Sequence, residues 1–326
     1  MTDLKQKILT AVRRDLEAIE SALAELLNPH FDLVRQVAGH ILFAGGKRLR
    51  PLLMVLCARL CGNQDPHTVQ SAVIFEYLHA ATLLHDDVVD GGELRRGTDA
   101  AHQVWDPPTA VLTGDFLLAR ALGLAARTGL PEVIDTIAAI TEQMSQGEIE
   151  QMARTGDLSL TEADYREVIR CKTAVLFQGA CRTGALITRA EPVRVDALGD
   201  YGHHLGMAFQ MADDLLDYTL DAGVLGKKAG ADLREGKLTL PVIHTLRHSD
   251  DGERRWISHL IGSQDVAAEA FERLIALLTD NGSIAYTRQC ARDHIALAKG
   301  ALSGFDPGPQ RGVLSDIADY ALLRTA

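Results

Sequence analysis

The chain has 326 residues and a formal net charge of −11, which argues against nucleic acid or an anionic membrane surface as its main partner. Hydrophobic residues make up 47% of the chain and aromatic residues only 5%, a composition that favours helices over β-sheet. The five cysteines are odd in number and lack a disulfide-like spacing, so we expect core thiols in a reducing compartment.

Helical periodicity recurs along the whole chain, and no alternating strand pattern, solenoid repeat or low-complexity linker interrupts it. The predicted helices are Leu4 to Leu27, Phe31 to Phe43, Leu52 to Leu60, Thr68 to Asp90, Pro107 to Arg127, Pro131 to Met152, Thr161 to Arg189, Val195 to Leu220 and Leu238 to Arg247, with several shorter ones from about Glu253 onward. The sequence therefore predicts a single all-α domain over residues 1–326.

We find no pattern typical of a targeting signal in the sequence. The start of the chain, Met1 to Glu20, is polar and carries acids, which is untypical of a secretory signal or a transit peptide. We find no stretch of about 18 consecutive apolar residues, which is the length needed to cross a bilayer. We therefore expect a cytoplasmic protein with no transmembrane segment.

The first candidate binding element is the loop after Phe43. Gly45 and Gly46 allow the backbone to approach a ligand closely, and the loop carries Lys47, Arg48 and Arg50. Because the next helix begins beside these cations, an anion is favoured there. Lys47 and Arg50 are three residues apart and are predicted to face one phosphate group, although a solvated basic turn is the alternative.

The helix Thr68 to Asp90 ends in an acidic motif, with Asp86 and Asp90 four residues apart on one face. The spacing recurs at Asp213 and Asp217, after a second apolar run. A single copy would also be typical of a solvated helix end. Two copies indicate facing helices that hold a hard cation such as Mg²⁺ between carboxylates. The predicted metal ligands are Asp86, Asp87, Asp90, Asp213, Asp214 and Asp217.

Basic residues follow both acidic motifs: Arg95 and Arg96 after the first, and Lys227, Lys228 and Lys237 after the second. Carboxylates, a divalent cation and basic side chains together indicate a site for a diphosphate. Lys172 and Thr173 lie inside an apolar helix, where a phosphate would explain the lysine and an acidic partner is the alternative. His79 and Gln210 share faces with the aspartates, and either helix packing or function explains Gly147-Glu148.

These motifs resemble, in order, those of the trans-isoprenyl (polyprenyl) diphosphate synthases, especially the long-chain octaprenyl type. The resemblance runs from about Ala38 to Leu246 and more weakly to the C-terminus. It rests on the following stretches: Gly45 to Pro51, the first aspartate motif with Arg95-Arg96-Gly97, Ala110 to Phe116, Gly147-Glu148, Lys172-Thr173, the second aspartate motif, Gly226-Lys227 and Gly236 to Pro241.

The resemblance implies the isoprenoid synthase type I fold, a helical bundle around a central apolar cavity, and a homodimer. It implies that isopentenyl diphosphate attacks an ionised allylic diphosphate, with Asp86, Asp90, Asp213 and Lys172 in catalytic roles. Substrate-binding roles are implied for Lys47, Arg50, His79, Arg95, Arg96, Lys172, Thr173, Gln210, Lys227 and Lys237. Mg²⁺ is the implied cofactor. A non-catalytic subunit would usually lack motif residues that this chain retains, and a class I terpene cyclase would not need the second set of cations.

Product length is predicted from the helix before Asp86, whose residues Phe75, Leu78, Ala81 and Thr82 are candidate chain-length determinants. Ala81 and Thr82, the fifth and fourth residues upstream, are small and leave room for a product of about thirty carbons or more on that helix face. Phe75 lies eleven positions before Asp86, roughly 16 Å along the helix from it. If it faces the lumen, a farnesyl or geranylgeranyl product is the alternative.

Overall fold

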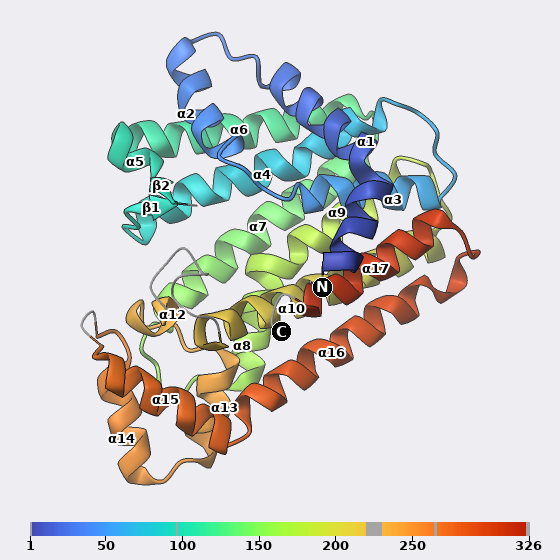
Figure 1. The fold of residues 1–326 in the computed structure, drawn as a ribbon. Helices are drawn as coiled ribbons and strands as arrows, with labels where there is room; N and C mark the ends of the chain where they lie inside the picture. The colour runs from blue at the N-terminus through green and yellow to red at the C-terminus, as the bar shows by residue number, and fades with distance from the viewer. Residues whose placement is uncertain (1, 96, 220–229, 264–265, 324–326) are drawn as a thin grey trace.

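The computed structural model describes residues 2–95, 97–219, 230–263 and 266–323, and over these residues the predicted all-α fold is confirmed (Figure 1). Its elements are α1 (Thr2–Leu27), α2 (Asp32–Leu42), α3 (Leu49–Leu60), α4 (Thr68–Val89), β1 (Leu94–Arg95), β2 (Thr98–Asp99), α5 (Ala101–Val104), α6 (Pro107–Arg127), α7 (Pro131–Ala153), α8 (Glu162–Ile169), a π-helical turn (Arg170–Ala174), α9 (Val175–Leu186), α10 (Pro192–Thr219), α12 (Ala231–Arg234), α13 (Leu240–His248), α14 (Asp251–Leu260), α15 (Ala268–Asp280), α16 (Ser283–Ala301), a 3₁₀ turn (Leu302–Gly304) and α17 (Pro309–Leu323).

Helix boundaries follow local signals where such signals exist. Asp106 caps α6 by accepting a hydrogen bond from the backbone N–H of Thr109 at 2.7 Å, and Pro107 occupies the first helical turn. Thr161 and Asp164 form a capping box at the start of α8. The single predicted helix Thr161 to Arg189 is interrupted by the π-helical turn, which the hydrophobic pattern did not indicate.

The helices pack in an order that surrounds one central space. Helix α4 lies along α6, α7 lies against both α6 and α9, and α10 lies between α9 and α16. Helices α13, α14 and α15 gather at one end of the bundle (Figure 1). This packing places the acidic motifs of α4 and α10 around the same interior, as expected if two facing helices hold a cation between them.

Two glycines let α10 approach the preceding segment closely. A Cβ placed on Gly202 would lie 2.5 Å from the carbonyl oxygen of Phe177, and one on Gly206 would lie 2.6 Å from the Cα of Ala174. Both contacts are with backbone, so no side chain could be accommodated without separating the helices. This close packing fixes the π-helical turn, and with it Lys172 and Thr173, against the second acidic motif.

Helix α6 qualifies the expectation that no segment could cross a membrane. Among the described residues, α6 is the one helix that is long and apolar enough to cross a membrane. The core helix of a soluble protein can have the same length and composition. In the structure it packs along α4, and 39% of its most apolar window is buried inside the bundle.

A histidine cluster joins α10 to α16 on the side of the bundle formed by α8. The Nδ1 atoms of His204 and His294 are 3.0 Å apart, and Nη1 of Arg166 lies 3.3 Å from Nε2 of His294. Because a guanidinium group only donates, neutral His294 must accept at Nε2 and donate from Nδ1 to His204. Burial, followed by the charges of His204 and Arg166, lowers the pKa of His294 to about 4.

We therefore expect the free energy of unfolding to fall as the pH is lowered from about 6.5 toward 4, because in this window His294 is protonated in the unfolded chain but not in the folded chain. At about 1.4 kcal/mol per pH unit the loss would be on the order of 3 kcal/mol, reduced by solvent screening of the half-buried ring. A His294→Asn variant should lose less stability than the wild type in thermal melts across this range. His67→Asn, at an exposed position, is the control, and parallel pH profiles for wild type and His294→Asn would contradict the assignment.

Candidate active site

The acidic motifs lie at a cavity of about 640 Å³ bounded by α4, α7, the π-helical turn, α10 and the segment after residue 230. Most predicted site residues are brought together here. Those that line it are Arg50, Leu78, His79, Ala81, Thr82, Asp86, Asp90, Arg95, Lys172, Thr173, Gln210, Asp213 and Lys237.

Three carboxylates of the acidic motifs line this cavity, Asp86 and Asp90 from the end of α4 and Asp213 from α10, together with Glu148, Asp232 and Glu235. Burial, then the charge of Glu148, raises the pKa of Asp86 to about 6, while Lys172 acts in the opposite direction. Asp90 accepts a hydrogen bond from Nζ of Lys237 at 3.1 Å, and Asp213 is exposed to the cavity. Asp86 and Asp90 share a face, as their spacing predicted.

The other three predicted metal ligands are buried and hydrogen-bonded within the protein, and they are not among the residues that line this cavity. Asp87 accepts a hydrogen bond from Nε of Arg95 at 2.7 Å, and Asp217 accepts from the backbone N–H groups of Ala231 and Asp232 at 3.1 and 3.0 Å. The second residue of each motif points about 100° away from the first around the helix axis and so enters the packing. Asp217 keeps the expected face but caps the start of α12.

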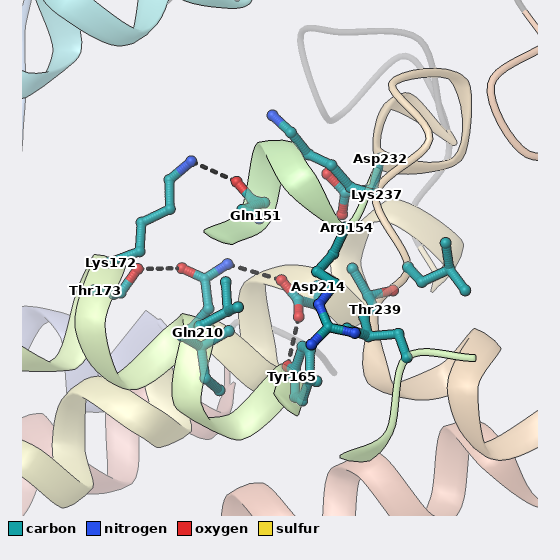
Figure 2. Close-up of a pocket in the computed structure, with 14 residues that line it drawn as sticks. Gln151, Arg154, Tyr165, Lys172, Thr173, Gln210, Asp214, Asp232, Lys237 and Thr239 are labelled. Carbon is teal, nitrogen blue, oxygen red and sulfur yellow. Dashed lines mark hydrogen bonds between the residues drawn. The ribbon is translucent and has the colours of Figure 1, made fainter. Parts of the chain in front are cut away.

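Asp214, the third of these residues, belongs to a chain of hydrogen bonds that crosses three segments (Figure 2). Thr173 donates to Gln210 at 2.8 Å, Gln210 donates to Asp214 at 2.7 Å, and the hydroxyl of Tyr165 donates to the other carboxylate oxygen at 2.6 Å. Burial is the main cause that raises the pKa of Asp214, to about 7. The chain fixes the side chains of Thr173 and Gln210 at the cavity wall.

Lys172 has the acidic partner that the sequence left open as an alternative. Its Nζ lies 2.6 Å from Glu148 and donates to Gln151 at 2.7 Å (Figure 2). A Cβ at Gly147 would lie 2.7 Å from the Cβ of Cys171, so this glycine lets α7 approach the π-helical turn. Gly147-Glu148 therefore serves both packing and the site: the glycine brings the helices together and the glutamate holds the lysine.

The basic loop before α3 divides its cations among three environments. Arg50 lines the cavity, with its guanidinium 4.7 Å from the ring centroid of Phe177. Arg48 is buried and forms ion pairs with Glu20 and Glu76 at 2.6 and 2.8 Å, which gives it a structural role. Lys47 borders a separate apolar cavity between α1, α10 and α17. Arg96, Lys227 and Lys228 lie outside the described residues.

Four side chains near the site were absent from the predicted set: Glu148, Gln151, Tyr165 and Asp232. Asp232 lines the cavity together with Lys237. It is an acidic residue in a lysine-rich segment after the second acidic motif, and this position could have identified it as a site residue from the sequence. Tyr165 carried no such signal because its role depends on the packing of α8 against α10. Figure 2 shows Gln151, Tyr165 and Asp232 on separate segments around the pocket.

An all-helical bundle with facing acidic motifs, interleaved cations and an apolar interior defines a class of enzymes that handle prenyl diphosphates. The chain belongs to the polyprenyl synthetase family, whose profile matches residues 31–278.

Individual relatives align over almost the whole chain. It is 35% identical over 319 residues to octaprenyl diphosphate synthase of Escherichia coli strain K12, covering 98% of each chain. Its fold matches the structure of a Caulobacter crescentus polyprenyl synthase complexed with calcium and isoprenyl diphosphate, with a TM-score of 0.92, 38% identity and 98% coverage of both chains. A decaprenyl diphosphate synthase from Rhodobacter capsulatus matches with a TM-score of 0.92 and 38% identity, covering 98% of this chain and 99% of that chain.

The two adjacent aspartates of the second motif should respond differently to truncation. Asp214→Ala leaves the buried donors of Tyr165 and Gln210 without their acceptor and should lower the free energy of unfolding by about 1–3 kcal/mol. Asp213→Ala removes an exposed carboxylate whose charge repels that of Asp214, so the loss of stability should be smaller than in Asp214→Ala. Urea denaturation of both variants measures the difference. Equal losses for the two would contradict the division between cavity-facing and buried aspartates.

Proposed function

We propose that this protein condenses isopentenyl diphosphate head to tail with an allylic diphosphate to form an all-trans polyprenyl diphosphate. The observation that carries the proposal is the meeting of Asp86, Asp90 and Asp213 at one cavity, with Lys172 and Lys237 interleaved between them. Such a set of charges suits a diphosphate held through a divalent cation. The family and its relatives support the same reaction.

The three cavity-facing carboxylates fit Mg²⁺ as the proposed cofactor. They supply only oxygen ligands, which hard divalent cations prefer. Burial, followed by the charge of Glu148, raises the pKa of Asp86 to about 6. The relative from Caulobacter crescentus was crystallised with calcium and isoprenyl diphosphate, which also supports a divalent ion. When bound, the metal would act as a Lewis acid toward the diphosphate leaving group.

The cations around the carboxylates are proposed to bind the allylic diphosphate. Arg95 is held by Asp87, and Lys237 by Asp90, so both are oriented before a substrate arrives. Lys172 would exchange Glu148 and Gln151 for phosphate oxygens, which keeps a half-buried ammonium group paired in either state. Lys227 is proposed to assist from outside the described residues. Stabilisation of the developing diphosphate charge is the main catalytic contribution of these groups.

The second substrate, isopentenyl diphosphate, is proposed to bind apart from the allylic diphosphate, at Lys47, Arg50, His79 and Arg96. Of these, Arg50 and His79 line the described cavity. Thr173 and Gln210, fixed by the buried Asp214 chain, would orient the allylic substrate. The apolar walls formed by Leu78, Ala81 and neighbouring residues exclude water that would otherwise quench the carbocation. The released diphosphate is the proposed acceptor of the final proton.

A long product is proposed on the basis of the α4 wall. Ala81 and Thr82 line the cavity without obstructing it, whereas a bulky aromatic residue there would close it near the metals. Relatives named for octaprenyl and decaprenyl products support a long chain.

The decisive assay combines purified protein, isopentenyl diphosphate, an allylic primer and Mg²⁺. We expect products of about thirty carbons or more, complete loss of turnover with EDTA, and at least about a 100-fold loss in Asp86→Asn because it removes a charged metal ligand. Chromatography of the dephosphorylated products measures both rate and length. A major product of fifteen or twenty carbons would overturn the long-chain proposal. Absence of condensation would overturn the proposed reaction.

We further propose a cytoplasmic homodimer, with α6 at the interface. Leu112, Ala119, Leu122 and Ala126 lie on one exposed face of this helix and form an apolar stripe that the exposed Asp115 interrupts. Leu112 is 66% exposed, which is unusual for a leucine in the middle of a long helix. A second copy presenting the same stripe would cover it in a two-fold arrangement.

Introducing charge into this stripe should dissociate the dimer. We expect Leu112→Glu to sediment as a 35.4 kDa monomer at micromolar concentration, while the wild type sediments at about twice that mass. Leu297→Glu on α16 is a matched control, because Leu297 is 54% exposed and lies away from α6. A wild-type monomer, or dissociation by both variants alike, would contradict the proposed interface.

A further inference from the structure

The side of α4 that lines the cavity extends beyond it, toward the N-terminus of the helix. Asp86, Thr82 and Leu78 line the cavity, and Phe75 is the next residue on the same side. From Asp86 to Phe75 the helix advances roughly 16 Å. An isoprene unit contributes four bonds to a chain and spans roughly 4–5 Å by ordinary covalent geometry, so this depth holds about three or four units. A longer product has to pass the level of Phe75.

At that level three helices close the interior. Phe75 on α4 is fully buried. A Cβ placed on Gly179 of α9 would lie 3.6 Å from the Phe75 ring and 2.1 Å from Cδ1 of Ile140 on α7. The Ile140 side chain therefore already occupies the space over Gly179, and the backbone of Gly179 forms the rest of the closure.

The outer side of this closure is a groove of about 400 Å³ between α7 and α9. Ile140 and Gly179 also line the groove, so they border both the closure at the level of Phe75 and the space outside. Ala139, Val175 and Leu186 give the groove an apolar floor, and its other lining residues are polar: Glu132, Asp135, Thr136, Gln143, Gln178 and Arg182. The wall between the interior and the groove is thus about one side chain thick at Gly179.

We propose that, given the prenyl-transfer function above, the growing chain leaves the bundle through the seam between α7 and α9 at Gly179. Ile140 acts as the gate, and the apolar floor of the groove receives the distal end of the product. A change of rotamer at Ile140 moves only a side chain and leaves both helix backbones in place, so the gate can open without disrupting the bundle. Gly179 is needed because any side chain there would occupy the passage.

Two substitutions with opposite expected effects test the seam. Gly179→Leu fills the passage and should shorten the major product to about twenty carbons, the length that the depth above Phe75 accommodates. Ile140→Ala removes the gate and should lengthen the product by at least one five-carbon unit. Ile137→Ala is the matched control: Ile137 is equally buried on α7 but does not line the groove, so product length should stay at the wild-type value.

Product length is measured with a common primer, and the rate of the first condensation is measured separately for each variant. If Gly179→Leu does not fold, as judged by its thermal melt, Ile140→Ala and its control still decide the question. Unchanged length in Ile140→Ala, or equal lengthening in Ile137→Ala, would overturn the seam. A wild-type product of twenty carbons would also overturn it while leaving prenyl transfer intact. Absence of condensation in the wild type would instead overturn the proposed function.

Discussion

Repulsion among the carboxylates at the cavity is the constraint on which the rest of the site depends. Asp86, Asp90 and Asp213 bring like charges to one cavity, and burial, followed by the charge of Glu148, raises the pKa of Asp86 to about 6. Such a cluster would be unstable without cations placed at fixed points around it. Lys237 reaches Asp90 from the segment after residue 230, and Lys172 stands near Asp86 from the π-helical turn.

The buried aspartates of the two motifs supply the rigidity that this arrangement requires. Asp87 orients Arg95, Asp214 orients Gln210, and Asp217 caps the short helix that carries Asp232 toward the cavity. Each motif therefore divides its acids between the cavity and the packing. A charged cluster can be held open for a ligand because neighbouring residues, one position along, anchor the helices that carry it.

The sequence predicted the helices and the cavity-facing aspartates well because local rules determine both. Pro107, Pro131 and the capping pair at Thr161 set helix starts directly, and spacing alone placed Asp86 and Asp90 on one face. Prediction was poorer where partners distant in sequence decide. The π-helical turn, the burial of Arg48 between Glu20 and Glu76, and the pairing of Asp214 with Tyr165 all depend on packing between helices. The motif as a string of residues does not distinguish an aspartate that faces a cavity from one that faces a neighbouring helix.

The same limitation explains why Phe75 could not be interpreted from sequence. Its position on α4 follows from counting residues, but whether it ends the cavity depends on what faces it from α7 and α9. An aromatic ring against thick packing would be a fixed floor. Against Gly179 and a single aliphatic side chain, it is instead one face of a thin wall with a groove behind it. Product length in such a bundle is then set less by the volume of the cavity than by which side chain along its wall is easiest to displace.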